Sequence, residues 1–335
     1  MSKYMKHIIL KVPGPVVALM VITAALLGSL ARSSAQTWPQ RPVKIIVSQA
    51  AGGTPDIICR LISAKLSAAL GQQFIVENRP GGANVVGASA AAHAPADGYT
   101  LFFATAAALV SNPHTFKSLP YDPLKDFAAV SMIAINPFIV LANRDVLANT
   151  LSELVAYDKA NPGKLTFATD GPRNFSGILA TWLNKISGAN ILQVPYATMP
   201  QGVQDTIAGR TQLTILAIPS AAPHIATGVL KPLAVSWTKR VAQFPQVAAI
   251  AETFPGIELT GWLMFVAPAA TSTAIITQLN REIDIILKAP DLVARLAELG
   301  FFTTDIRTPE AARSFILAQY ELWGKVVREI GLQPE

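Results

Sequence analysis

The chain has 335 residues, of which 51% are hydrophobic and only 14% are charged, with a formal net charge of +6. This composition excludes a disordered chain and is typical of a globular protein with a large core. No cluster of Lys and Arg interleaved with aromatic residues follows the first 35 positions, so the sequence predicts no nucleic-acid surface.

The first 35 residues have the pattern of a secretory signal peptide. Lys3, Lys6 and Lys11 precede an apolar run over residues 16–30, and Ser33-Ser34-Ala35 has the small-x-small pattern of a cleavage site. The run is short for a membrane span, which needs about 20 residues, although a retained N-terminal anchor stays open as an alternative. We therefore expect export to the periplasm and a nearly neutral mature chain.

The mature part alternates short apolar strands with helical patterns. Strands are predicted at 43–47, 73–76, 100–104, 138–142, 164–168, 191–195, 212–217, 233–236 and 262–267. Helices are predicted at 56–70, 85–93, 151–161, 178–187, 203–208, 274–287, 291–299 and 309–330. Such alternation favours an α/β protein with parallel sheets covered on both faces, and a length of about 300 residues favours two domains.

A glycine turn follows the first predicted strand. Ala50-Ala51-Gly52-Gly53 joins strand 43–47 to helix 56–70, and Asp56 is expected to cap that helix. Glycines allow close backbone approach, and the first N–H groups of a helix lack intrahelical partners, so the corner predicts an anion site. The Lys-Ser/Thr ending of a phosphate loop is missing, which favours a carboxylate over a phosphate. Glycines that only shape a tight connection remain the alternative.

A second corner of the same kind follows strand 164–168. It reads Thr169-Asp170-Gly171-Pro172-Arg173-Asn174-Phe175-Ser176-Gly177 and leads into the helical pattern from Ile178. Two such corners are able to face each other across a cleft in a two-domain α/β protein.

The chain resembles the extracytoplasmic solute receptors of tripartite tricarboxylate transporters, the Bug family. The segments that carry the resemblance are residues 41–47, Ala50-Ala51-Gly52-Gly53 with Asp56, Val76-Glu77-Asn78-Arg79-Pro80-Gly81, Ala96-Asp97-Gly98-Tyr99-Thr100-Leu101, Asn112-Pro113, residues 119–127, residues 161–165, Val194-Pro195-Tyr196, Pro219-Ser220 with Pro223-His224-Ile225, and Ala267-Pro268-Ala269.

This resemblance implies a two-lobed, type II periplasmic-binding-protein-like fold with a ligand cleft between the lobes. Lobe 1 would comprise residues 36–137 plus 261–335, and lobe 2 residues 138–260, after a signal peptide over 1–35. The implied ligand is a small organic carboxylate that lobe closure captures for the membrane permease subunits of a tripartite transporter. A monomer is implied, with no cofactor, no metal and no catalysis.

The resemblance also implies the ligand-binding residues. The first-lobe site would comprise Ala51, Gly52, Gly53, Asp56 and Thr105. The second-lobe site would comprise Thr169, Asp170, Gly171, Arg173 and Asn174.

Several departures from the family pattern fall at this expected site. Ser48 and Gln49 replace a Pro and an aromatic residue, Ala106 replaces a Ser, and Ile215-Leu216 replaces Phe-Asp. The second corner has lost the usual Gly, Thr, Pro and His and has gained Asp170, Arg173 and Phe175. We therefore hypothesise a ligand other than simple C4–C6 di- and tricarboxylates.

Two of the gained residues leave alternatives open. Arg173 either binds a ligand carboxylate through its planar fork or pairs with Asp170 and stiffens the loop. Phe175 either walls the ligand or packs under the loop. Trp262 is expected to pack, with ligand contact as the alternative.

No catalytic or metal motif is evident. Cys59 is the only cysteine and is expected to be a small buried residue, and His93, His114 and His224 lack metal-ligand spacing. No nucleophile–base set is recognisable, which argues against a secreted α/β hydrolase. A sensor subunit that docks on a membrane kinase would share the fold and stays open as an alternative to transport.

Overall fold

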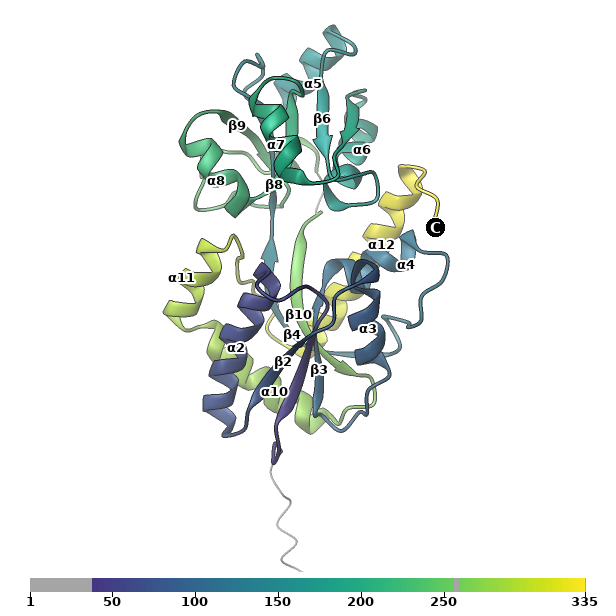
Figure 1. The fold of residues 1–335 in the computed structure, drawn as a ribbon, viewed down its shortest axis with the longest axis vertical. Helices are drawn as coiled ribbons and strands as arrows, with labels where there is room; N and C mark the ends of the chain where they lie inside the picture. The colour runs from purple at the N-terminus through teal and green to yellow at the C-terminus, as the bar shows by residue number, and fades with distance from the viewer. Residues whose placement is uncertain (1–37, 256–258, 335) are drawn as a thin grey trace, which may run out of the picture. The chain divides into compact units, whose positions relative to one another are not determined.

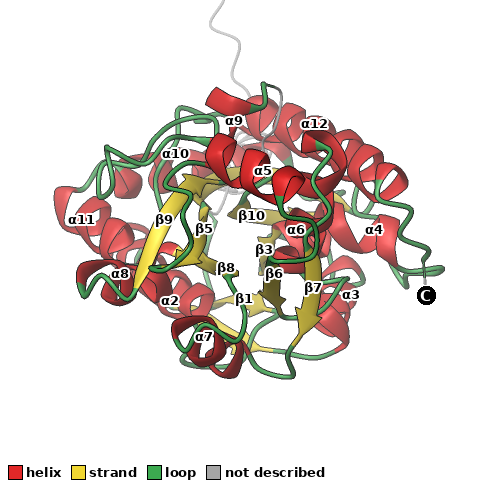
Figure 2. Ribbon diagram, turned by 90° about the horizontal axis from the view of Figure 1, so that it is seen from above, coloured by secondary structure: helices red, strands yellow, loops and turns green. Residues whose placement is uncertain are grey.

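The computed structural model describes residues 38–255 and 259–334, so the predicted signal peptide lies outside the described residues. The strands, named β1 to β10 in chain order, form two five-stranded sheets, and Figures 1 and 2 together label them. The expected α/β class is confirmed, with each sheet flanked by helices. No helix among the described residues combines the length and the apolar character that crossing a bilayer requires.

The first sheet takes strands from two distant stretches of the chain. Its order is β2 (Phe74–Asn78), β1 (Val43–Val47), β3 (Thr100–Thr105), β10 (Gly261–Pro268) and β4 (Phe127–Asn136). In Figure 1 the pale-green β10 lies among purple and blue strands. Strand β1 runs parallel to β2 and β3, whereas β10 runs antiparallel to β3 and β4.

The second sheet repeats this mixture. Its order is β7 (Leu192–Pro195), β6 (Thr166–Thr169), β8 (Leu213–Ala217), β5 (Phe138–Asn143) and β9 (Leu230–Val235). Strand β6 is parallel to β7 and β8, and β5 is antiparallel to β8 and β9.

The expectation of purely parallel sheets was therefore wrong. A parallel pairing needs a crossover of a dozen or more residues. Strands β4 and β5 are separated only by Pro137, so the chain passes straight from one sheet into the other without a crossover helix. Strand β10 later returns to the first sheet, and it inserts antiparallel between β3 and β4.

Helices pack on both sheets. Against the first lie α2 (Thr54–Leu70), α3 (Val85–Ala92), α10 (Thr273–Leu287) and α12 (Pro309–Glu329). Against the second lie α6 (Phe175–Ser187), α7 (Met199–Ile207) and α8 (Ile218–Ala226), which Figure 2 shows in red beside the yellow strands. Helix α11 (Pro290–Glu298) packs on α10, and α5 (Leu151–Ala160) contacts the short α9 (Ile250–Thr253).

Burial on both faces explains the sequence pattern of strand β3. Leu101, Phe102, Phe103 and Ala104 of β3 are fully buried, so both faces of this strand are apolar and no alternation is visible in the sequence. Helix α2 begins after Gly53, has Pro55 in its first turn, and ends at Gly71, whose φ of 69° closes the helix in the left-handed region.

The ends of the strands position the site. Strand β3 ends at Thr105 and runs into a π-helical turn, η2 (Ala107–Ser111), followed by α4 (Asn112–Thr115). A 3-10 turn, η1 (Gly82–Asn84), precedes α3. Helix α12 contacts β4 and η2 of the first half of the fold and also α6 beside the second sheet.

Candidate functional site

A cavity of about 430 Å³ lies where the chain crosses between the two sheets. Thr105 comes from the end of β3, Asn136 from the end of β4, and Phe138 from the start of β5. The first residues of β10 and α6 and one residue of α12 complete its wall. A volume between 300 and 1,000 Å³ is usual for sites that bind small molecules.

Aromatic side chains dominate the wall. The six that line it are Phe116, Phe138, Phe175, Trp262, Phe301 and Trp323. The rings of Phe138 and Phe175 are stacked, with centroids 4.0 Å apart and planes 21° apart, and both side chains are half-buried. Trp323 lies 6.3 Å from Phe175 in a tilted arrangement. Phe175 therefore packs on Phe138 and also lines the cavity, and its contact with a ligand stays a prediction.

The cavity carries little charge. Among the described residues that line it, Arg173 has the only charged side chain, and no carboxylate is present. The neutral polar residues of the wall are Asn84, Thr105, Ser111, Asn112, Thr115, Asn136 and Asn174. Arg173 also donates from Nη1 to the carbonyl of Gln333, 2.8 Å away, just beyond α12. The guanidinium is thus held at the wall by the segment that follows α12.

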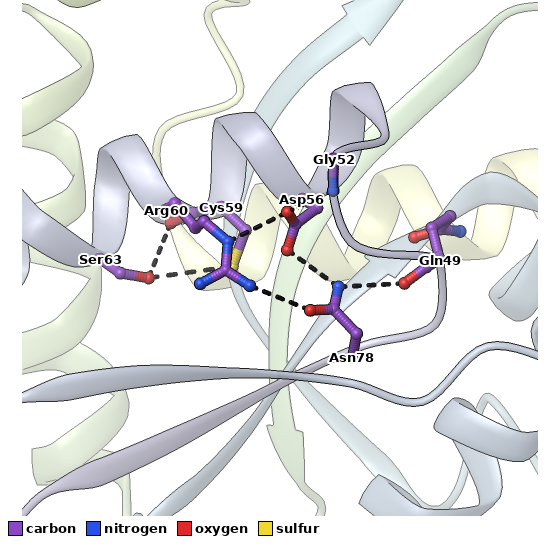
Figure 3. Close-up of polar contacts among 7 residues, drawn as sticks. All are labelled: Gln49, Gly52, Asp56, Cys59, Arg60, Ser63 and Asn78. Carbon is purple, nitrogen blue, oxygen red and sulfur yellow. Dashed lines mark hydrogen bonds and ion pairs between the residues drawn. The ribbon is translucent and has the colours of Figure 1, made fainter.

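The first corner is closed on itself by Asp56, as Figure 3 shows. One carboxylate oxygen, Oδ2, accepts the Gly52 N–H at 2.9 Å and Arg60 Nε at 3.0 Å. The other, Oδ1, accepts Asn78 Nδ2 at 2.8 Å. Gly53 is the N-cap residue, so Asp56 lies inside the first turn and closes the preceding loop instead of capping the helix as the sequence suggested.

The electrostatics of Asp56 follow from these contacts. Burial by itself would raise the pKa of this carboxyl, whose side chain is 3% exposed. The hydrogen bonds from Arg60, the Gly52 N–H and Asn78 outweigh burial and hold the pKa below its usual value. Asp56 is therefore ionised at neutral pH and fully engaged within the corner.

The first corner contributes little surface to the cavity. Its Pro55 lines the wall, whereas Ala51, Gly52, Gly53 and Asp56 are not among the lining residues. Gly53 donates its N–H to the Ala50 carbonyl at 3.2 Å, so two of the corner's backbone donors already have acceptors. Thr105, the other predicted first-lobe residue, does line the cavity.

A loop that the sequence analysis overlooked supplies Asn84. Ala83 and Asn84 have φ angles of 49° and 79°, a left-handed conformation that is uncommon outside glycine. Asn112 Nδ2 donates to the Ala83 carbonyl at 2.7 Å, and Asn84 Oδ1 accepts from Ser48 Oγ at 3.0 Å and from Gln49 Nε2. Ser48 and Gln49, which precede the first corner, therefore hold Asn84 at the cavity.

The second corner contributes two of its predicted residues to the wall of the cavity. Arg173 and Asn174 line the cavity, whereas Thr169, Asp170 and Gly171 do not. The Asp170 carboxylate accepts the Ser176 hydroxyl, and the Asp170 carbonyl accepts Asn174 Nδ2 at 2.6 Å. Thr169 is fully buried, and Gly171 has a φ of 111° that turns the chain. These three residues shape the loop that carries Arg173.

The two tryptophans of the wall are largely sealed from solvent. Trp262 is 1% exposed and packs edge-on against Phe315 at 5.5 Å, and Trp323 is 2% exposed. Neither indole N–H has a hydrogen-bond partner among the described residues. Packing, the expected role of Trp262, is observed, and its ring also forms part of the cavity wall.

Cys59 and His114 lie in surroundings that are typical of structural residues. Cys59 is fully buried, and burial raises the pKa of its thiol to about 12. His114 Nε2 bonds the Tyr320 carbonyl at 2.9 Å, and burial lowers the pKa of His114. Over residues 38–255 and 259–334, no group of three His, Cys, Asp or Glu side chains is close enough to hold a metal ion.

The sequence is similar to a known family model and to known proteins. The sequence model of the family described as tripartite tricarboxylate transporter family receptor, TctC, matches residues 58–332. Protein BugT of Bordetella pertussis is 34% identical over 316 residues, which cover 94% of this chain and 97% of BugT.

Solved structures agree in fold. One of an R. palustris protein with adipate superposes with a TM-score of 0.74 at 30% identity and covers 89% of this chain and all of that one. MatC from Rhodopseudomonas palustris with bound malate gives a TM-score of 0.69 at 27% identity, over 87% of this chain and all of MatC.

Proposed function

Because this chain belongs to the TctC family of tripartite tricarboxylate transporter receptors, we propose that its aromatic cavity captures a small organic carboxylate for that transport. The family is one of binding proteins, and the chain is a solute receptor. The similar structures that hold adipate and malate support a carboxylate as its ligand. The single observation that carries the choice of site is the presence of one cation, Arg173, in the wall of the 430 Å³ cavity.

The ligand carboxylate is bound by Arg173, Thr105 and Asn174 in this proposal. A guanidinium offers a planar pair of N–H donors that matches a carboxylate. The Thr105 hydroxyl accepts the Ala108 N–H at 3.4 Å and keeps its own proton to donate. Asn174 uses one N–H for the Asp170 carbonyl and keeps a second for the ligand.

The other predicted residues support these contacts. Gly52, Gly53 and Asp56, with Ala51 beside them, fix the first corner so that Pro55 is held at the cavity wall. Thr169, Asp170 and Gly171 fix the loop that carries Arg173. A site built on such supported elements keeps its geometry when the ligand binds.

The proposed ligand contacts come from both sheets, which favours capture of the ligand by closure of two lobes. Thr105 belongs to a strand of the first sheet, and Arg173 to a corner of the second. We propose that residues 36–137 with 261–335 and residues 138–260 act as two lobes. A ligand held from both would favour the closed state by its differential affinity for that state.

Location and partners complete the proposal. Solved relatives include proteins described as a periplasmic transporter and as the periplasmic binding protein BugD. We propose that residues 1–35 direct export to the same compartment, where the protein delivers its ligand as a monomer to the membrane subunits of the transporter.

Thermal unfolding with a panel of carboxylic acids tests the proposal. An acid at about 100 times its Kd should stabilise the protein by about 2.7 kcal/mol, which raises Tm by several degrees for a chain of this size. Arg173→Gln should abolish the shift. Arg210→Gln is the matched control, because Arg210 is an arginine of the same half that pairs with Asp205 outside the cavity.

The outcomes separate the parts of the proposal. A Tm shift that survives in Arg173→Gln leaves the receptor and rejects Arg173 as the anchor. No shift with any acid, including adipate and malate, rejects the carboxylate.

A further inference from the structure

We propose that the end of α12 and the residues after it, 323–333, form a C-terminal strap that holds the second corner against the first sheet. Within it, Glu329 and its partner Trp182 are positioning residues that raise ligand affinity although neither lines the cavity. This inference rests on the proposed function, because it assumes that two lobes close on a ligand. It goes beyond that function by assigning residues outside the cavity that control the closure.

The body of α12 is fixed to the proposed first lobe. It contacts β4, η2 and α4. His114 Nε2 of α4 bonds the Tyr320 carbonyl at 2.9 Å, and the two rings lie 4.4 Å apart. A Cβ on Gly324 would lie 2.8 Å from His114 Cε1, so no space separates the two helices there. Helix α12 is therefore held in place independently of the second lobe.

The end of α12 contacts the proposed second lobe, where it reaches α6 (Figure 1). Three contacts join Trp323 to Phe175, Glu329 to Trp182, and Gln333 to Arg173. The two rings of the first contact lie 6.3 Å apart, the indole N–H donates to the carboxylate across 3.2 Å, and the guanidinium donates to the carbonyl across 2.8 Å. One helix thus connects the first lobe to the second corner.

The contact between Trp182 and Glu329 can be removed selectively. Trp182 is 3% exposed, so its indole N–H is left without a partner in a buried place when the carboxylate is removed. The acceptor on Gln333 is a backbone carbonyl, which a side-chain substitution does not remove. Phe175 and Arg173 line the cavity, so changing either would alter the site itself.

These contacts exist in the arrangement in which Thr105 and Arg173 line one cavity. If α6 moved away from α12 as the lobes separate, the contacts would be lost, so the strap favours the assembled cavity. A ligand that needs residues from both lobes binds only the assembled state, and its apparent affinity falls in proportion to the population of that state. Loss of the strap should therefore weaken binding while every ligand contact remains.

The first test measures the distance between the lobes without any ligand. Spin labels on Ala64→Cys of α2 and Ala156→Cys of α5 report it by pulsed dipolar resonance, since both positions are exposed and Cys59 is fully buried. We expect two separations in the wild-type background. Glu329→Ala should lower the population of the separation that the structure shows, relative to the other, by about 2- to 12-fold, the range of one hydrogen bond.

Matched variants assign this effect to the contact. Lys325→Ala removes the ion pair that Lys325 forms with Glu329 across 3.8 Å on the same helix, and it should change the ratio by less than about twofold. Glu329→Gln keeps an oxygen that accepts the indole N–H and should restore the wild-type ratio. Trp182→Phe should reproduce Glu329→Ala, and the double variant should add nothing further, because both remove the same contact.

The second test is titration calorimetry of the same variants with adipate. Glu329→Ala and Trp182→Phe should raise the Kd of adipate by about 2- to 12-fold, and Lys325→Ala by less than about twofold. The Tm of each unliganded variant checks that the protein is folded at the temperature of the titration.

Each other outcome overturns a defined part. One separation in every variant, unchanged by adipate, overturns capture by closure and this inference with it. Two separations whose ratio is the same in Glu329→Ala overturn the strap and leave the proposed function intact. An equal effect of Lys325→Ala overturns the role of the Trp182 contact. A changed ratio with an unchanged Kd of adipate overturns the link between the strap and affinity.

Discussion

The two corners of this fold have the same plan, a strand, a glycine turn and a helix, yet they do different things. At the first, Asp56 accepts three hydrogen bonds from within the corner, and only Pro55 reaches the cavity. At the second, the loop is fixed by Asp170 and Ser176, and Arg173, Asn174 and Phe175 all face the cavity. The first corner therefore turns its carboxylate back into its own loop, whereas the second directs side chains at the cavity.

The largest effect on stability is expected from a substitution that disrupts the second corner. A Cβ on Gly177 would lie 2.1 Å from the Gly171 carbonyl oxygen, so Gly177→Ala must displace backbone. We expect a loss of about 3 kcal/mol or more of unfolding free energy, measured by urea denaturation.

Gly53→Ala is the comparison at the first corner. A Cβ there would lie 3.2 Å from the Ala50 carbonyl, and the φ of Gly53 is an ordinary −69°. Its cost should stay near about 1 kcal/mol, the usual difference between glycine and alanine as N-cap residues. Equal losses for the two variants would contradict the claim that only the second corner requires glycine for space.

Asp56→Asn sharpens the contrast by testing stability and binding separately. We expect about 2 kcal/mol of destabilisation at pH 7, because an amide cannot accept from Arg60, Gly52 and Asn78 together. Ligand affinity should change by less than about twofold by titration calorimetry, which corresponds to less than about 0.4 kcal/mol. A large loss of affinity with little loss of stability would place Asp56 at the ligand instead.

The loss of stability in Asp56→Asn should depend on pH. The pKa of Asp56 is lower in the folded protein than the unfolded value of about 3.9. Its stabilisation is therefore complete above about pH 5 and is lost as pH falls through 3.9 toward the folded pKa. The free energies of unfolding of wild type and Asp56→Asn should converge as pH falls below about 5, and a constant difference would exclude the charge as the cause.

A smaller effect concerns the tie between α12 and α6, the helix that follows the second corner. Trp182 Nε1 of α6 donates to Glu329 Oε2 at the end of α12, 3.2 Å away. Glu329→Ala should cost about 0.5–1.5 kcal/mol, measured by thermal unfolding. Glu298→Ala removes a comparable surface glutamate that pairs with Arg295, and it should cost less, since both members of that pair are well exposed.

The smallest effect tests how closed the first corner is. Cys59 lies one turn into α2, and its thiol is fully buried with a pKa raised to about 12. A thiol reagent at pH 8 should give no detectable labelling of the native protein and full labelling in denaturant. Rapid labelling of the native state would mean that α2 opens readily.

Sequence reasoning predicted the elements well where their signals are local. The first helix was expected at 56–70 and runs from Thr54 to Leu70, because Pro55 and Gly71 mark its ends. Strand β4 was missed, since its apolar run, nearly all buried, has neither a two-residue nor a helical period. The antiparallel insertion of β10 was missed because pairing between distant segments leaves no trace in either segment alone.

The site was only partly predictable for the same reason. Thr105, Arg173 and Asn174 were expected and do line the cavity. The aromatic wall was not foreseen as a group, because Phe138, Trp262 and Trp323 each look like ordinary core residues at widely separated positions. Asn84 was missed as well, although Gly81-Gly82 before it is a turn signal.

The place of β10 has a consequence for how the protein is made. Strand β10 fills the gap between β3 and β4, and its last residue follows the end of β3 by 163 positions. At a synthesis rate of about 5–20 residues per second, the facing edges of β3 and β4 wait about 10–30 s for their shared neighbour. Until β10 arrives, these edges present unpaired N–H and C=O groups with which another strand is able to pair.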